Sequence, residues 1–391
     1  MTATAPTPGY TLRQLSLYFL KLGYSGFGGP VALVGYMHRD LVEKQGWISE
    51  DEYKEGLALS QLAPGPLAAQ LGIYLGYVHY GFLGATLTGL AFVLPSFLMV
   101  LALGMVYKLY GGLPWMQAAY YGVAAAVMGI ILLSTYKLTT KSISKINPEG
   151  LRNNSFLWIL YVAAAVTTVV TQSESVVLLL ASGLLYMLVK APPRLSAQTV
   201  RNSVFLGVGL APLPWGTLGE IALFFTKAGA FVFGSGLAIV PFLHSGVVVE
   251  NGWLNEQEFL DAVAVAMITP GPVVITVGFI GYLIAGFWGA TVAALATFLP
   301  CYLITVGCAP YYKRIAQNKS IKAFVTGITA AVVGALLGAV IVIASRSIID
   351  LPTILIALVT MVVLLKVKKV QEPQIVLVAA LVGIVLKLGL Q

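Results

Sequence analysis

Two kinds of chain break, both rich in glycine and proline and both present twice, contain the residues best placed for chemistry. The first kind reads Phe27-Gly28-Gly29-Pro30 and, 206 positions later, Phe233-Gly234-Ser235-Gly236. The second kind reads Pro64-Gly65-Pro66 and Pro270-Gly271-Pro272. Where such a break begins a helix, the N–H groups of the first turn are unpaired and the helix dipole is positive. The pattern predicts recognition of an anion.

The prolines of the second kind of break indicate where the donors would lie. Pro66 and Pro272 suit the first position of a helix, because their missing N–H is not needed there and their fixed φ starts the helix. The N–H groups around each tip would then be free. The predicted backbone candidates are Gly28, Gly29, Gly65, Pro66, Leu67, Ala68, Gly234, Gly236, Gly271, Pro272, Val273 and Val274. The alternative is that the glycines only allow close helix packing.

Positive charge occurs at two equivalent positions. Lys21 and Lys227 each lie about ten residues into an apolar segment, and an ionisable residue inside a membrane helix is a functional hypothesis by default. The alternative is that these flexible side chains extend to the nearer interface. Ser25, Ser235 and Gln70 lie close to the breaks and are further candidate donors, although serine in a membrane helix also bonds its own backbone.

A group of charged residues and histidines forms a second, gating or coupling set. Its members are His38, Arg39, Asp40, Glu43, Glu220 and His244. The histidines end the first helical segment of each half, where they could sense pH or act as caps. Asp40 or Glu43 could act as a gate by pairing with Arg39. Glu220 is the nearest candidate for a proton-coupling carboxylate.

The amino-acid composition indicates the surroundings in which these residues act. The 391 residues are 58% hydrophobic and only 10% charged, far from the averages of soluble domains. Apolar runs such as 83–106 and 328–344 approach the roughly 20 residues that span a bilayer, and backbone hydrogen bonding in lipid makes them helices. We therefore predict an all-α polytopic protein of the plasma membrane, with lipid as its surroundings and no cleavable signal peptide.

Several function classes are disfavoured. The net charge of +8 is assigned to membrane orientation rather than to nucleic acid. Cys301 and Cys308 lie seven apart in one apolar segment, too distant to pair, and the three histidines form no cluster with metal-ligand spacing. We predict no enzyme activity, no cofactor and no metal, so transport would depend on ion gradients.

The chain is a duplication. Residues 19–66 and 225–272 align without a gap, with 17 of 48 positions identical. We predict two transporter repeats, 1–195 and 196–391, each with about five crossings and one Pro-Gly-Pro re-entrant hairpin. The first crossing is expected over 12–37 and 217–243. With both hairpins turning back, 17 of the 23 Lys and Arg residues fall on one side, which favours inverted repeats with that side cytoplasmic.

At these motifs the sequence resembles the chromate ion transporter family in its long-chain, two-domain form. The likeness rests on Phe27-Gly28-Gly29-Pro30, on Pro64-Gly65-Pro66, on Leu41-Val42-Glu43 through Trp47, and on Leu94-Pro95. It implies export of chromate, a tetrahedral dianion that resembles sulfate, and hence chromate resistance. The second half has Gly234-Ser235-Gly236 where the first has Gly28-Gly29-Pro30.

Other functions stay open at this point. A sulfate-type importer of the same fold would raise sulfate uptake, and an anion channel would show rapid, non-saturating conductance. A membrane-bound chromate reductase is disfavoured, because haem, flavin and iron–sulfur motifs are absent from the sequence. The apolar faces of the terminal segments 156–189 and 354–388 could pack on the same chain or on a neighbouring copy, and we predict a homodimer.

Overall fold

The computed structural model describes residues 9–27, 29–111, 113–173, 175–193, 216–232, 236–367 and 370–388. Within these ranges the chain is helical and contains no strand, which confirms the prediction of an all-α protein. Four helical segments are long and apolar enough to cross a membrane, namely 67–110, 114–142, 273–311 and 319–347. The predicted boundary between the repeats, at 195, lies outside the described residues.

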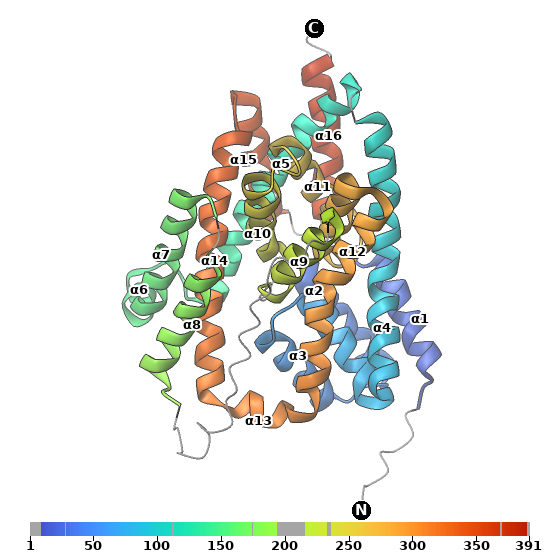
Figure 1. Cartoon of the computed structure of the whole chain (residues 1–391), viewed down its shortest axis with the longest axis vertical. Helices are drawn as coiled ribbons and strands as arrows, with labels where there is room; N and C mark the ends of the chain where they lie inside the picture. The colour runs from blue at the N-terminus through green and yellow to red at the C-terminus, as the bar shows by residue number, and fades with distance from the viewer. Residues whose placement is uncertain are drawn as a thin grey trace, which may run out of the picture.

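The two halves contain matching series of helices (Figure 1). The first half consists of α1 (Leu12–Ser25), α2 (Gly29–Met37), η1 (His38–Lys44), α3 (Glu50–Leu62), α4 (Leu67–Tyr110), α5 (Pro114–Ser142), α6 (Pro148–Asn153), α7 (Ser155–Thr171) and α8 (Val176–Lys190). The second consists of α9 (Gly216–Ala230), η3 (Gly236–Ile239), α10 (Val240–His244), η4 (Ser245–Glu250), α11 (Glu256–Ile268), η5 (Val273–Ile275), α12 (Thr276–Cys308), η6 (Ala309–Tyr311), α13 (Tyr312–Gln317), α14 (Lys319–Ser347), α15 (Leu351–Lys366) and α16 (Glu372–Leu388).

The segment around Pro-Gly-Pro in the first half is a helical hairpin. Ser49 and Glu52 form a capping box that starts α3, and the chain turns at residues 63–66 before α4 begins. Helix α4 then reverses at Gly81, whose φ of 57° requires glycine. Beyond this point α4 packs back on its own first part, because the Thr88 hydroxyl donates to the Gly72 carbonyl oxygen over 3.0 Å.

The second half repeats this hairpin. Asn255 and Glu258 form the capping box of α11. Helix α12 reverses at Ala285 and Gly286, and Gly281 lies directly against Gly289 across the reversal. Small residues at these contacts let the two helical parts approach closely, as is common between membrane helices.

Residues 12–44 also fold back, which differs from the predicted single crossing over 12–37. Tyr10, before α1, stacks on Trp47, after η1, with ring centroids 5.0 Å apart. Each of the two arms is about 21–24 Å long, so their outer ends meet only if the arms lie alongside each other. Gly29, with φ of 72°, provides the freedom for this turn. In the second half, Phe224 of α9 packs against Gly246 of η4.

The terminal helices of each half pack on the long helix of the other half. Helices α7 and α8 pack on α14, and α15 and α16 pack on α5 (Figure 1). Small residues again make the contacts close, since Gly334 of α14 lies against the Tyr161 backbone and Gly122 of α5 against the Ala379 backbone. The outward faces of the terminal helices remain apolar and exposed. The homodimer stays a prediction.

Candidate functional site

Breaks from both halves meet in the interior. The Gly65 N–H donates to the Val232 carbonyl oxygen over 2.6 Å, and the Gly271 N–H donates to the Gly26 carbonyl oxygen over 2.8 Å. Each Pro-Gly-Pro tip is thus bonded to the first break of the opposite half. The exchange is reciprocal, as expected where two similar units contact each other about a two-fold axis. We call this region the tip junction, formed by the described residues 26, 27, 29, 63–68, 232, 236, 237 and 269–274.

Two details of the predicted donors are wrong. The N–H groups of Gly65 and Gly271 are not free, because they make the bonds that join the halves. Pro66 and Pro272 precede the first helical residue instead of occupying the first position. The remaining predicted donors belong to the first helical residues, Leu67, Ala68, Val273 and Val274, and all four are buried. Their N–H groups precede the intrahelical ladder.

The tips are packed against a residue that follows a Leu-Pro pair. Gly271, with φ of 95°, lies so close to Ser96 that an added Cβ would be 2.0 Å from the Ser96 hydroxyl oxygen. That hydroxyl donates to the Pro270 carbonyl oxygen over 2.8 Å. Gly65, with φ of 136°, lies against Cys301, and a Cβ added there would be 2.9 Å from the Cys301 side chain. The sequence analysis missed Ser96 and Cys301. Their signal is the recurrence of Leu94-Pro95 as Leu299-Pro300.

The polar side chains predicted near the breaks have different positions. Gln70 is fully buried at the tip junction, where its Nε2 donates to the Pro64 carbonyl oxygen over 2.7 Å. Its Oε1 is buried with no partner among the described residues. The Ser25 hydroxyl is exposed and donates to the Lys21 carbonyl oxygen over 2.8 Å, within its own helix. Gly236 is buried against Val273 and Val274. Gly28, Gly234 and Ser235 lie outside the described residues.

The two lysines are exposed. Lys21 lies on the face of α1 that also exposes Leu17 and Tyr24. Lys227 is exposed on α9. The structure therefore does not bring them together with the buried tip residues, and their role in binding stays a prediction. Glu220 is likewise exposed, near the start of α9.

The histidines and charged residues after the first break contact acidic side chains at the ends of the hairpins. His38 contacts Glu50 at 2.8 Å and Glu43 at 3.0 Å, and the equivalent His244 contacts Glu256 at 2.8 Å.

Arg39 pairs with Asp40 at 2.9 Å. Asp40 and Glu43 were the two predicted partners, and the structure pairs Arg39 with Asp40. The hydrogen bond from Arg39 lowers the pKa of Asp40 below its ordinary value. Their gating role stays a prediction.

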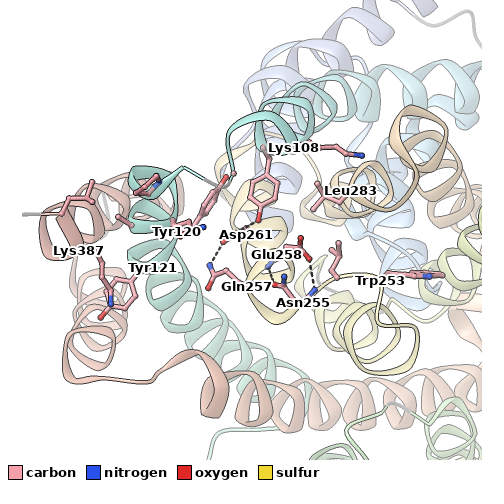
Figure 2. A pocket seen from close by; sticks show the side chains of 17 residues that line it. Lys108, Tyr120, Tyr121, Trp253, Asn255, Gln257, Glu258, Asp261, Leu283 and Lys387 are labelled. Atoms are coloured by element: carbon pink, nitrogen blue, oxygen red, sulfur yellow. Dashed lines mark hydrogen bonds between the residues drawn. The ribbon is translucent and has the colours of Figure 1, made fainter. Parts of the chain in front are cut away.

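Two cavities lie at opposite ends of the bundle. The upper cavity, about 930 Å³, is lined by α11 of the second half and by the end of α4 and start of α5 of the first half (Figure 2). The lower cavity, about 750 Å³, is lined by α3 of the first half and by α13 and α14 of the second. In Figure 1 α13 lies at the bottom, and the end of α16, which supplies Lys387 to the upper cavity, lies at the top.

The cavities have corresponding residues because of the duplication. Tyr107 of the upper cavity corresponds to Tyr312 of the lower, Asp261 to Glu55, and Gln117 to Lys322. Each cavity thus has an acid and a tyrosine from opposite halves. No group of three potential metal ligands occurs in the part of the chain that the structure describes.

Known proteins of one kind match this chain over nearly its whole length. A family model described as chromate transporter matches residues 13–187 and 219–384. The chromate transport protein of Cupriavidus metallidurans is 61% identical, over 98% of this chain and 94% of its own. The probable chromate transport protein of Synechococcus elongatus is 60% identical, over 97% and 96%. The chromate transport protein of Pseudomonas aeruginosa is 31% identical, over 86% and 82%. No solved structure matches the chain.

Proposed function

Because this chain belongs to the chromate transporter family and is a multi-pass protein of the plasma membrane, we propose that it is a secondary transporter that exports chromate from the cytoplasm and so confers chromate resistance. The carrier works by alternating access: the dianion enters the lower cavity, binds at the tip junction and leaves through the upper cavity. The halves are inverted repeats, and the hairpins at α3 and α11 are re-entrant.

One observation carries this proposal, namely that helix N-termini from both halves converge at the tip junction between two cavities. An isolated dianion in a low-dielectric interior is prohibitively costly. The positive ends of α4 and of η5, which leads into α12, have first-turn N–H groups at Leu67, Ala68, Val273 and Val274. These ends provide compensation without a buried lysine. Half-helix N-termini at the midplane are a recurring anion site in transporters.

The assignment of sides follows from the basic residues. Lys54, Lys319 and Lys322 belong to the elements around the lower cavity, whereas Lys108 and Lys387 line the upper one. Together with the distribution over the whole sequence, this favours a cytoplasmic lower cavity. Moving a dianion outward across an inside-negative membrane then releases about 4.6 kcal/mol per 100 mV, at roughly 2.3 kcal/mol per unit charge.

The direct bonds between the tips favour a carrier over a channel. Gly65 is bonded to Val232, and Gly271 to Gly26, so the halves touch where a pore would pass. A carrier must break these bonds in each cycle, which gives saturable flux, whereas a channel conducts without saturation. A sulfate-type importer remains the alternative among carriers, because sulfate has the same shape and charge.

The test is potential-driven flux of radiolabelled chromate into proteoliposomes, with sulfate as competitor. Leu67→Pro removes one first-turn N–H, at a position that tolerates proline, and Leu67→Ala is the matched control that keeps the N–H. A charge-assisted hydrogen bond is worth about 1.5–3 kcal/mol. We therefore expect flux at least about tenfold lower in the proline variant than in the alanine variant.

The same pair at Val273 tests the other half. Saturable chromate flux that is lost only with proline supports the proposal. Equal flux in both variants would remove the helix N-termini from the site. Absence of chromate flux, with sulfate transported instead, would assign the importer.

A further inference from the structure

A buried carboxylate beside the upper cavity has no role in the site described so far. Asp261 lies on α11 and is 1% exposed. The Tyr107 hydroxyl donates to its Oδ2 over 2.8 Å, and the Gln257 amide donates to its Oδ1 over 2.8 Å. A phenol hydroxyl and an amide are both uncharged donors, so neither neutralises a carboxylate. No lysine, arginine or histidine forms an ion pair with Asp261 within the described ranges.

The groups that face Asp261 come from each packed element and do not supply a counter-charge. Glu258, on the same helix, is tied to the Asn255 backbone by its capping box. Figure 2 shows Lys387 on the far side of the cavity beside Tyr121, and Lys108 pointing away from Asp261. The titratable groups that line the cavity with Asp261 are Tyr107 and Lys108 on α4, Tyr120 and Tyr121 on α5, Lys387 on α16 and Glu258 on α11. Other charged groups on the packed elements include Glu256 on α11, Arg346 on α14 and Glu250 on η4, and α12 contributes Leu283 to the lining.

Two opposing effects act on the ionisation of a carboxyl group in such a place. Burial disfavours the ionised form, whereas the two hydrogen bonds favour it. A neighbouring anion shifts this balance towards the neutral acid, because like charges repel in a poorly screened interior. Asp261 precedes the end of α11 by seven residues, about 10 Å along the helix. A dianion at the tip junction or in the upper cavity is therefore close enough to act on it.

We propose that Asp261 is a proton-binding site of the transport cycle, whose carboxyl group takes up a proton when chromate occupies the tip junction or upper cavity and releases it when chromate leaves. This inference rests on the proposed function. The cavity provides the route for the proton, and Tyr107 from the opposite half links the protonation state to the interface between the halves. By linkage, acidification strengthens anion binding by the same factor by which the anion strengthens proton binding.

The equivalent residue in the first half is a contrast. Glu55 lies 206 positions earlier and lines the lower cavity, but it is only half-buried. Contact with water favours the ionised form of a carboxyl group. The duplication thus provides two acids at one structural position, and only the buried one is assigned to proton binding.

The experiment measures proton uptake by purified protein in nanodiscs, in weak buffer with a pH-indicator dye, on addition of chromate. Mildly alkaline solution is used, because free chromate is then the dianion. The native protein should take up a proton on binding, and Asp261→Asn should bind chromate with none. The dissociation constant of the native protein should rise by up to about tenfold per pH unit on the alkaline side, and that of Asp261→Asn should stay constant.

Controls separate this role from a structural one. Asp261→Glu keeps a carboxyl group and should keep the uptake. Asp51→Asn removes an exposed carboxylate from α3, at the position equivalent to Gln257, and should also keep it. Chromate binding with equal proton uptake in native protein and Asp261→Asn would overturn the inference and leave the proposed function intact. Failure of the native protein to bind chromate would overturn the proposed function and the inference together.

Discussion

The two hairpins of the halves share their backbone and differ in their charges. Both begin with a capping box, turn at Pro-Gly-Pro and place a glycine of positive φ against the opposite half. At the cavity wall, however, one has the half-buried Glu55, and the other has Asp261, which is buried and accepts a hydrogen bond from Tyr107. The part that both halves share is thus made of backbone, and the side chains at the two ends differ.

A second difference lies at the outer ends of the same hairpins. Glu50 binds His38 and the exposed Lys54, both close to solvent. Glu256 binds His244, which is buried, and also Arg346 from α14. Arg346 in turn contacts Gln172 after α7. The upper end of the molecule is therefore tied across three helices, whereas the lower end is held by local pairs.

The largest expected effect comes from breaking the shared part, the glycines at the tips. Gly271→Ala would place a Cβ 2.0 Å from the Ser96 hydroxyl oxygen at a φ of 95°. We expect a loss of about 3 kcal/mol or more of stability, with loss of flux. Ser96→Ala should restore part of it by removing the clashing atom. Thermal unfolding in detergent measures both, and Gly35→Ala, where nothing lies within 4 Å, is the neutral control.

An equal loss at Gly65→Ala would show that the tips are equivalent, since its added Cβ meets Cys301 and Gln70 at 2.8–2.9 Å. Survival of both variants with native flux would contradict the close contact of the halves.

The next largest effect is expected at the outer ends of the hairpins, where the two halves differ. Arg346→Gln leaves the half-buried Glu256 without its guanidinium partner, and we expect a loss of about 2 kcal/mol in stability. Lys54→Gln breaks an exposed pair and should cost less than about 0.5 kcal/mol. Similar losses in the two variants would refute the asymmetry. Chemical or thermal unfolding at neutral pH is the measurement.

The stability lost in Arg346→Gln should also depend on pH. Burial would raise the pKa of Glu256, but the hydrogen bonds from His244 and Arg346 lower it below its ordinary value. A lowered pKa stabilises the fold above the ordinary carboxyl pKa, and this contribution is lost as pH falls. The gap between native protein and Arg346→Gln should therefore narrow below about pH 4.5.

A smaller effect is expected from the cavity charges. Lys322→Gln gives the lower cavity the residue that the upper cavity has at Gln117. The initial rate of chromate entry into inside-out membrane vesicles should fall by about threefold to tenfold at low salt, and by less at high salt, because the lysine attracts the dianion over a distance that salt screens. An unchanged rate at low salt would exclude the lower cavity as the cytoplasmic entrance.

The features predicted correctly from sequence are those that local residues determine. The capping boxes at Ser49 and Asn255 and the turns at Pro-Gly-Pro depend on a few neighbours each, and the structure has them. The fold-back of residues 12–44 was missed, because it depends on the contact of Tyr10 with Trp47, far apart in the chain. A glycine break permits both a kinked crossing and a reversal, and its local sequence does not distinguish them.

The site was predicted in part for the same reason. The convergence of breaks follows from their repetition, but the bond from Gly65 to Val232 joins residues 167 positions apart, so the tip N–H groups were wrongly expected to be free. The search for a proton carrier indicated Glu220, which is exposed. Asp261 is buried by Tyr107 and other residues of the opposite half, and only its alignment with Glu55 was visible in the sequence.

The smallest effect is expected from the two lysines that were predicted from the sequence to supply positive charge. Lys21 and Lys227 occupy equivalent, exposed positions on α1 and α9, and the tip junction obtains its positive potential from buried helix N-termini. A lysine side chain on such a face extends to the interface. We therefore expect Lys21→Gln and Lys227→Gln each to change saturable chromate flux by less than about threefold, with the double variant close to the product of the two. A loss of tenfold or more in either variant, at unchanged thermal stability, would contradict this expectation. It would mean that the hairpins of residues 12–44 and 216–250 rotate during transport and bring the lysines to the dianion. Side chains, and not only backbone, would then be part of the binding device that the two halves share.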